Sequence, residues 1–358
     1  MSAGLLTGGA WIKKSPGPYS AEQVVHWLSR IGYDHSHTAE DIRSGAFQTT
    51  LENLGALSRR HLQAFPFENV AMHYEKDHFV DVSPRGLYQR LVVDGKGSYC
   101  FGLNGLLLGM IRGLGYRAYG GAARVNMARD PLDPIDFQGL THMVMFVQPG
   151  DSNQTWVVDV GFGGSGLARP MLLSDAEENV VLGTTPSERH RLVRKVLPMS
   201  SLELRDGSPS DHPQLEWQLH VSHTGGAEPW RVLYTFTDRE FFDCDYQAAS
   251  FDICTRPYLG LFWDMVWAVK YFTLDGAEAE EVETQVETSG QISVHWPEHL
   301  GRLILSGKEA KKVVGTRNEI IATIETDGDR IRVLREFFGL SVVDEDAVHI
   351  KGRRAALG

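Results

Sequence analysis

The spacing of apolar residues changes near residue 118, and this change limits the folds open to the chain. Upstream, Val24, Leu28 and Ile31 share one face of a predicted helix. Downstream, short segments such as residues 231–237 alternate apolar with polar residues, as strands do. The pattern therefore predicts an α+β protein, with helices first, strands in the middle and mixed structure last.

The two ends of the chain carry weaker patterns. Residues 1–18 contain Gly and Pro with little periodicity, which predicts a loose arm. A helix is expected at residues 329–338, closed by Gly339. The residues beyond that helix are expected to form a tail.

Cys100 lies where a glycine-containing loop runs into a strongly helical pattern. Leu103, Leu107 and Leu114 follow it at helical spacing, so Cys100 falls in the first helical turn. Unpaired N–H groups and the positive end of the helix dipole favour a thiolate there, and the thiolate is the form that attacks a carbonyl carbon. Free cysteine is also among the most buried residue types, so its position alone leaves a structural role open.

Residues 141–160 contain two strand patterns separated by turn residues. A tight hairpin that pairs Gln148 with Asn153 would place His142 directly opposite Asp159, within reach of an imidazole–carboxylate hydrogen bond. A base oriented by a carboxylate and placed beside a thiol is a Cys-His-Asp nucleophile triad. The alternative is a structural His-Asp pair with no part in chemistry.

The motifs around these residues resemble those of the arylamine N-acetyltransferase family. The resemblance rests on residues 66–69 (PFEN), 99–105 (YCFGLNG) and 158–163 (VDVGFG), and on His142, which occur in the family's order and at similar spacing. It extends over about residues 19–342. It implies that the activity is transfer of an acyl group from coenzyme A.

The resemblance also implies a fold. It predicts a helical domain at residues 1–116 that carries the nucleophile, a β-barrel domain at residues 117–225 that carries the histidine and aspartate, and an α/β lid domain at residues 226–358. A cysteine-protease-like triad would lie at the junction of the first two domains. Its members would be Cys100, His142 and Asp159.

Six further residues are expected to contact the substrates. The resemblance places two phenylalanines beside the acceptor, and a third is expected to join them because aromatic amines pack well against aromatic rings. These residues are Phe67, Phe162 and Phe101. The residues expected at the coenzyme are Gly139, Gly163 and Thr255.

The chain departs from the family pattern next to Cys100. The family usually has Arg-Gly-Gly where this chain has Lys96-Gly97-Ser98, and a Glu or Gln is common where Gly102 stands. The first departure removes the arginine that would pair with Glu68. What supports the nucleophile loop here is therefore left open.

Composition excludes several other classes of protein. A net charge of −11 and a pI near 5.7 argue against nucleic acid or an anionic membrane as the main partner. Three cysteines make no disulfide framework for 358 residues, and no signal peptide or membrane span is predicted, so we expect a cytoplasmic protein. No metal-ligand spacing is evident. The oligomeric state is not indicated.

Three functions follow from these patterns. The first is a ping-pong acyltransferase that moves an acetyl, propionyl or malonyl group from coenzyme A to an aromatic amine or hydrazine. The second is a triad hydrolase acting on an amide or ester, and the third is a non-catalytic relative. A malonyl donor would require a cation near Cys100, for which Arg169 and Lys96 are the candidates.

Overall fold

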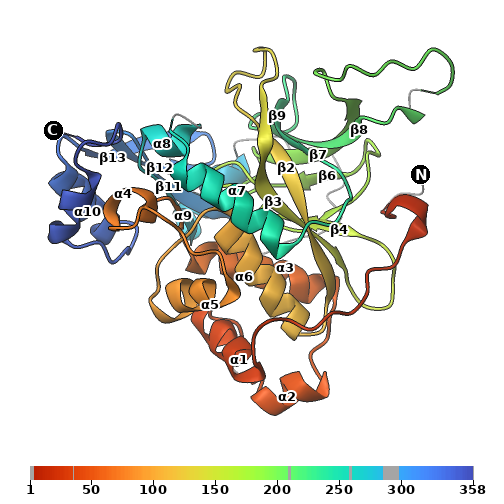
Figure 1. The fold of residues 1–358 in the computed structure, drawn as a ribbon, viewed down its shortest axis with the longest axis horizontal. Coiled ribbons are helices and arrows are strands. Elements are labelled where there is room, and N and C mark those ends of the chain that lie inside the picture. The colour runs from red at the N-terminus through yellow and green to blue at the C-terminus, as the bar shows by residue number, and fades with distance from the viewer. Residues whose placement is uncertain (1–3, 35, 209–210, 258–259, 285–297, 358) are drawn as a thin grey trace.

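The computed structural model describes residues 4–34, 36–208, 211–257, 260–284 and 298–357. Figure 1 shows helices from the first part of the chain, a curved sheet from the middle, and a second sheet covered by C-terminal helices. The fold is therefore α+β, as the sequence predicted.

The helices fall into an N-terminal and a C-terminal group. The first group consists of η1 (Thr7–Gly9), α1 (Ala21–Arg30), α2 (Ala39–Ser44), α3 (Leu51–Ala64), α4 (Ala71–Tyr74), α5 (Pro84–Leu87), η2 (Tyr88–Val93) and α6 (Cys100–Gly113). The second consists of α7 (Asp243–Thr255), α8 (Leu261–Asp264), α9 (Gly276–Thr284), α10 (Asp327–Glu336), η4 (Asp344–Asp346) and α11 (Ala347–Ile350).

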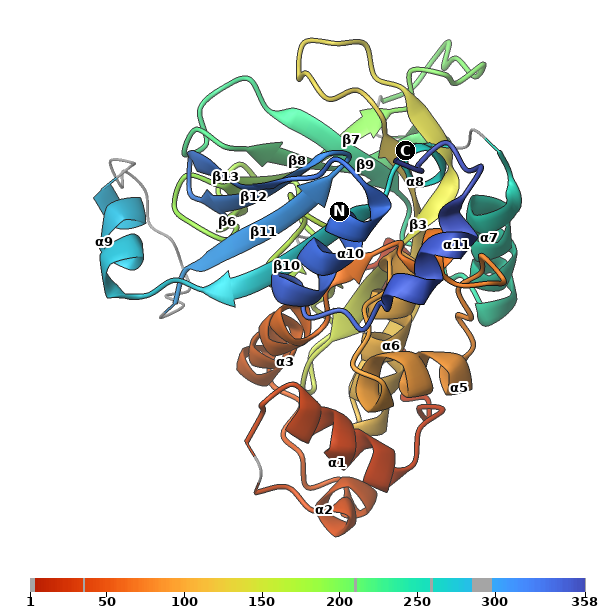
Figure 2. The same ribbon diagram turned by 90° about the vertical axis from the view of Figure 1, so that its left-hand side faces the viewer.

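Helix α6 lies at the centre of the N-terminal group because it is apolar on nearly every face. Its residues from Cys100 to Asn104 and from Leu106 to Ile111 are all buried. It packs against the first strands of the curved sheet on one side and against α1 and α5 on the other. Figure 2 shows these helices together below the two sheets. A nucleophile at the start of α6 is therefore fixed by the protein core.

An eight-stranded antiparallel sheet curls into a nearly closed barrel. Its strand order is β5-β4-β3-β2-β9-β8-β7-β6. The strands are β2 (Arg117–Asn126), β3 (Phe137–Gln148), β4 (Trp156–Val158), β5 (Met171–Leu172), β6 (Val180–Leu182), β7 (Arg189–Val196), β8 (Leu215–Ser222) and β9 (Arg231–Phe236). Strand β9 follows residue 225, so a division that keeps this sheet whole would end the second domain after β9. The three-domain division itself stays a prediction.

A second, five-stranded sheet joins the start of the chain to its end. Its order is β1-β10-β11-β12-β13, with all pairs antiparallel. The strands are β1 (Phe67–Glu68), β10 (Trp267–Thr273), β11 (Leu300–Ser306), β12 (Glu309–Val314) and β13 (Arg317–Thr323). Because β1 comes from the helical region, this sheet holds the C-terminal part of the chain against the segment before Cys100.

The predicted hairpin register is wrong by two residues. Strand β3 pairs Phe146 with Val157, where the sequence predicted Phe146 opposite Thr155. The loop is longer than expected because Thr155 donates its N–H to Gly4 O instead of to β3. A shift of two residues leaves every side chain on its predicted face, since side chains alternate along a strand.

Both chain ends pack more closely than predicted. The expected loose arm instead buries Leu6 and Ile12 against the barrel, and Ile12 donates its N–H to the Gln148 side chain (2.8 Å). The expected tail after α10 buries Leu340 and Ile350 against the five-stranded sheet and its helices. At both ends the apolar residues are too few to show the periodic spacing of a helix or strand. They are buried by packing against residues that are distant in sequence. Across the described residues, no helix combines the length and apolar character that a membrane span requires.

Candidate active site

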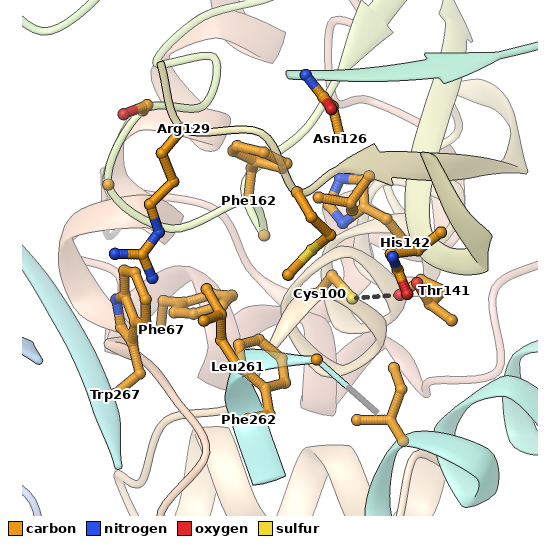
Figure 3. Close-up of a pocket in the computed structure, with 18 of the residues that line it drawn as sticks. Phe67, Cys100, Asn126, Arg129, Thr141, His142, Phe162, Leu261, Phe262 and Trp267 are labelled. Atoms are coloured by element: carbon orange, nitrogen blue, oxygen red, sulfur yellow. Dashed lines mark hydrogen bonds between the residues drawn. The ribbon is translucent and has the colours of Figure 1, made fainter. Parts of the chain in front are cut away.

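Cys100 is the first residue of α6, and Tyr99 precedes it in extended conformation as the N-cap. The side chain is almost fully buried, with its Sγ 3.6 Å from the Thr141 carbonyl oxygen (Figure 3). At this position the N–H groups of the first helical turn have no intrahelical acceptor, and the helix dipole favours negative charge. The prediction that Cys100 opens a helix is confirmed.

His142 and Asp159 form a buried ion pair beside Cys100. His142 Nε2 donates to Asp159 Oδ2 at 2.8 Å. The two residues are diagonal neighbours across the β3–β4 ladder and not directly opposite, because of the two-residue shift. The second ring nitrogen, Nδ1, is not used by Asp159 and is available to the Cys100 thiol. The three predicted triad residues are therefore brought together by a register that the sequence did not give correctly.

The two partners shift each other's protonation. Burial alone would lower the pKa of His142, but Asp159 and the neighbouring Cys100 raise it, so that the pKa reaches about 10. Burial works against ionisation of Asp159, yet the ion pair with His142 and further hydrogen bonds hold its pKa below the usual range. At neutral pH the ring therefore carries a proton and the carboxylate carries its charge.

Asn104 fixes the carboxylate, a role that sequence reasoning missed. Its Nδ2 donates to Asp159 Oδ1 (2.9 Å) and to Met143 O (2.7 Å), and its Oδ1 accepts the N–H of Val160 (2.9 Å). Asp159 Oδ1 also accepts the Gly161 N–H at 2.9 Å. A signal was present in the sequence, since Asn104 is a polar residue one turn after Cys100 on an apolar helix.

Gly161 allows the strand end to approach α6. A Cβ at this position would lie 2.7 Å from Cys100 Cα and 2.8 Å from the Asn104 side-chain nitrogen. Any larger residue would push the Asp159 loop away from the helix. The glycine-rich segment after β4 thus serves close backbone approach.

Tyr234 on β9 is a second residue that the sequence did not indicate. Its ring centroid lies 5.0 Å from that of His142 and 5.2 Å from that of Phe162, which in turn meets His142 edge-on at 5.3 Å. Burial and the nearby Asp159 carboxylate hold the pKa of Tyr234 well above its usual value. The imidazole of His142 thus packs against two aromatic rings.

Arg90 supplies the partner of Glu68 that the local motif lacks. Its Nη2 donates to Glu68 Oε1 (2.7 Å), its Nη1 to Glu75 Oε1 (2.8 Å) and its Nε to Gly97 O (2.7 Å). Lys96 instead pairs with Glu75 at 3.0 Å. The arginine therefore comes from η2, six residues upstream of Lys96, and it still ties the loop before Cys100 to strand β1.

The other two departures from the family motif compensate each other. Ser98 is buried, and its side chain fills the space that a side chain at position 102 would enter. A Cβ on Gly102 would lie 2.5 Å from Ser98 Cβ and 3.2 Å from Leu87 Cδ2. A larger residue at position 98 thus accompanies a smaller one at position 102.

A cavity of about 380 Å³ opens beside the triad (Figure 3). Most of its wall is apolar or aromatic, as suits a small-molecule site. Lining residues include Phe67, Cys100, His142, Phe162, Phe262 and Trp267. The predicted acceptor contacts Phe67 and Phe162 thus lie in the cavity wall.

The other predicted contacts are placed differently. Phe101 does not line this cavity, because its ring packs in the core against Tyr99 and Tyr246. Gly139 lies between the lining residues Gln138 and Thr141, and Gly163 between Phe162 and Gly164. Thr255 is exposed at the end of α7, where its hydroxyl donates to Phe251 O (2.7 Å). Coenzyme contacts of Gly139, Gly163 and Thr255 stay predictions.

Neither cation proposed for a carboxylated acyl group lines the cavity. Lys96 is held by Glu75, and Arg169 is buried elsewhere with its Nη2 3.4 Å from Gly183 O. The guanidinium groups that line the cavity belong instead to Arg129 and Arg231. Within the described ranges, no group of three or more His, Cys, Asp or Glu side chains is arranged to hold a metal ion.

Comparison with known proteins assigns this fold and site to a family. The N-acetyltransferase family model matches residues 50–266, which is more than half of the chain. The chain belongs to the arylamine N-acetyltransferase family and is an acyltransferase.

Its curated relatives carry two kinds of name. The N-malonyltransferase FDB2 of Gibberella moniliformis is 26% identical over 301 residues, covering 82% of this chain and 79% of that protein. The arylamine N-acetyltransferase of Mycobacterium tuberculosis is 32% identical over 215 residues, covering 60% of this chain and 65% of that protein. The relatives thus include both acetyl and malonyl transferases.

Solved structures show the same fold. The arylamine N-acetyltransferase from Mycobacterium abscessus superposes with a TM-score of 0.66 at 22% identity, covering 94% of this chain and 97% of that one. The Mycobacterium marinum enzyme in complex with CoA gives a TM-score of 0.62, also at 22% identity, covering 92% and 95%.

Proposed function

We propose that this chain is an N-acyltransferase that moves a short acyl group from coenzyme A to an arylamine or arylhydrazine through an acyl-Cys100 intermediate. The observation that carries the proposal is the meeting of Cys100, His142 and Asp159, with Cys100 and His142 lining a largely apolar cavity. The family assignment and the CoA complex of the Mycobacterium marinum relative support the donor class.

In the first half-reaction, Cys100 Sγ attacks the thioester carbonyl carbon of the donor. A new carbon–sulfur bond forms, the bond to the coenzyme sulfur breaks, and protonated His142 gives its proton to the leaving thiolate. The N–H groups at the start of α6 favour the negative charge that develops on the carbonyl oxygen. Asp159 keeps the imidazole in position and stabilises its charge.

In the second half-reaction, the acceptor nitrogen attacks the acyl-cysteine carbonyl. His142 takes the proton of the amine, the carbon–sulfur bond to Cys100 breaks, and the amide leaves. Aromatic amines suit this step because they are largely neutral at pH 7 and can pack against Phe67 and Phe162. Acetyl, propionyl and malonyl donors all remain within the proposal. The protein is proposed to act in the cytoplasm, consistent with three free cysteines.

Intact-protein mass spectrometry tests the proposal. The protein is mixed with acetyl-CoA, propionyl-CoA or malonyl-CoA without an acceptor, beside a Cys100→Ala control. We expect one acyl adduct, absent from the control and removed by added arylamine. A protein whose Cys100 is readily alkylated but which takes no acyl group from any donor would contradict the acyltransferase and favour the hydrolase.

A further inference from the structure

The cavity that holds Cys100 is positively charged, although the chain as a whole carries a net charge of −11. Arg129 and Arg231 line it, and the described residues contribute no Asp or Glu to its wall. Asn126 and Gln138 add neutral polar groups nearby. A cation-lined cavity in an acidic protein indicates an anionic ligand group.

The two arginines lie on neighbouring segments. Arg231 begins β9 and is half-buried, whereas Arg129 is exposed in the loop that joins β2 to β3. Asn126 Nδ2 donates to Val232 O (3.0 Å) and holds the end of β2, where this loop begins, against β9. Figure 3 shows Arg129 extending from its loop toward Phe67 and Trp267. The two charges therefore face the same space from adjacent walls.

Neither guanidinium makes a hydrogen bond or an ion pair within the part of the chain that the structure describes. Glu188, the carboxylate whose charge acts on Arg231, forms ion pairs with Arg302 at 2.7 Å and with His223 at 3.5 Å. Burial, and then the charge of Arg129, lower the pKa of Arg231, which shows that the two positive charges oppose each other. A partly buried cation without an ion-pair partner, such as Arg231, is stabilised by an anionic ligand.

An acyl-CoA donor brings two kinds of anion, the phosphates of the nucleotide and, in a dicarboxylic acyl group, a free carboxylate. The pantetheine arm separates the phosphates from the thioester carbon. A carboxylate on the acyl group, by contrast, stays within a few bonds of that carbon. Half-buried Arg231 lines the same cavity of about 380 Å³ as the nucleophile, so its position favours the carboxylate.

We propose that Arg231 and Arg129 bind the free carboxylate of a dicarboxylic acyl donor, such as malonyl-CoA, while its thioester carbon lies at Cys100. The proposal rests on the proposed acyltransferase function and specifies its donor. Arginine suits the task because its planar fork binds a carboxylate through two parallel hydrogen bonds. The N-malonyltransferase among the relatives fits this donor chemistry.

The test compares donors in Arg231→Gln and Arg129→Gln variants. Arg205→Gln, at an exposed position in the loop between β7 and β8, is the matched control. We expect the ratio of kcat/KM for malonyl-CoA over acetyl-CoA to fall about 10- to 100-fold in Arg231→Gln, because a charged hydrogen-bonded pair is lost. Arg129→Gln should give a smaller fall, and we expect this variant to fold because the side chain is exposed. The control should leave the ratio unchanged.

Thioesters of N-acetylcysteamine separate the two anions, because they carry the acyl group without the nucleotide phosphates. The same fall with malonyl-N-acetylcysteamine would support the carboxylate site. Equal losses for malonyl-CoA and acetyl-CoA, with none for either N-acetylcysteamine thioester, would assign the arginines to the phosphates and overturn the proposal. An unchanged ratio in both variants would also overturn it. Failure of every donor to load Cys100 would instead contradict the acyltransferase function itself.

Discussion

Two arginines, Arg90 and Arg231, show how differently the two ends of the site are built. Arg90 has a partner for each of its nitrogens in Glu68, Glu75 and Gly97 O, and it holds the loop before Cys100. Arg231 lines the cavity with no such partner within the described residues. The first arrangement stabilises the fold, whereas the second keeps a charge available. The protein itself thus completes the triad side of the site, whereas we propose that a ligand completes the arginine side.

Asp159→Asn should break the triad end most severely. The amide cannot hold a charged imidazole, so the pKa of His142 should fall from about 10. We expect acyl transfer to slow about 10⁴-fold, as for the equivalent change in other nucleophile triads. Rapid-quench measurement of acyl-Cys100 formation gives the rate. The loss should be the same for acetyl-CoA and malonyl-CoA, and a donor-dependent loss would mean that the two ends are not separate.

Arg90→Gln should destabilise the protein by removing the side chain that holds the loop before Cys100. It would leave Glu68, which is almost fully buried, without its ion-pair partner. We expect the free energy of unfolding in urea to fall by about 3–5 kcal/mol. Arg85→Gln, at an exposed position just upstream, is the control and should change it by less than about 0.5 kcal/mol. Equal stability of the two variants would show that the buried pair does not support the loop.

Gly102→Ala should overpack the same loop. The added methyl would collide with Ser98, and we expect a loss of about 1–3 kcal/mol in unfolding free energy. Adding Ser98→Gly should restore most of it, because the space is then free. A double variant no more stable than Gly102→Ala would disprove the compensation between the two positions.

The pH dependence of stability should report the His142–Asp159 pair. The folded pKa of His142 is about 10 and the ordinary value is 6.5, so the folded state holds a proton that the unfolded state releases above pH 6.5. The contribution of His142 is thus complete below pH 6.5 and is lost as pH rises toward 10, whereas that of Asp159, whose pKa is lowered, is lost only in acid. We expect wild type to lose up to about 1.4 kcal/mol more per pH unit than Asp159→Asn in urea unfolding. Parallel profiles would contradict a charged pair.

Arg231→Gln should have the smallest effect on stability. Removing a half-buried cation that opposes Arg129 should leave the free energy of unfolding unchanged or raise it by less than about 1 kcal/mol. Thermal and urea unfolding beside Arg90→Gln make the comparison direct. A loss as large as that for Arg90→Gln would mean that Arg231 is a structural residue.

The sequence predicted well what depends on near neighbours. The start of α6 at Cys100 and the faces of β3 and β4 both follow from local spacing. The hairpin register was missed because Gly4, far upstream, takes the N–H of Thr155. The predicted face of each side chain is nevertheless correct, because side chains alternate along a strand and a shift of two residues returns each one to the same face.

The site was predictable in its reactive residues but not in their supports. Cys100 and His142 lie in motifs, whereas Arg90 reaches Glu68 only after the chain has folded back through α4 and α5. Likewise, nothing local distinguishes Arg231 from the other charged residues of alternating strands. Arg231 comes to line the cavity through the pairing of β9 with β2, two strands that are distant in sequence.

The fate of acyl-Cys100 distinguishes an acyltransferase from a hydrolase. The acyl-enzyme is isolated from excess donor and mixed with increasing arylamine, and the amide and the free acid are both measured. We expect amide to be the main product, at a rate that rises with amine concentration. Free acid as the main product, released at a rate independent of the amine, would show that Cys100 serves a hydrolase.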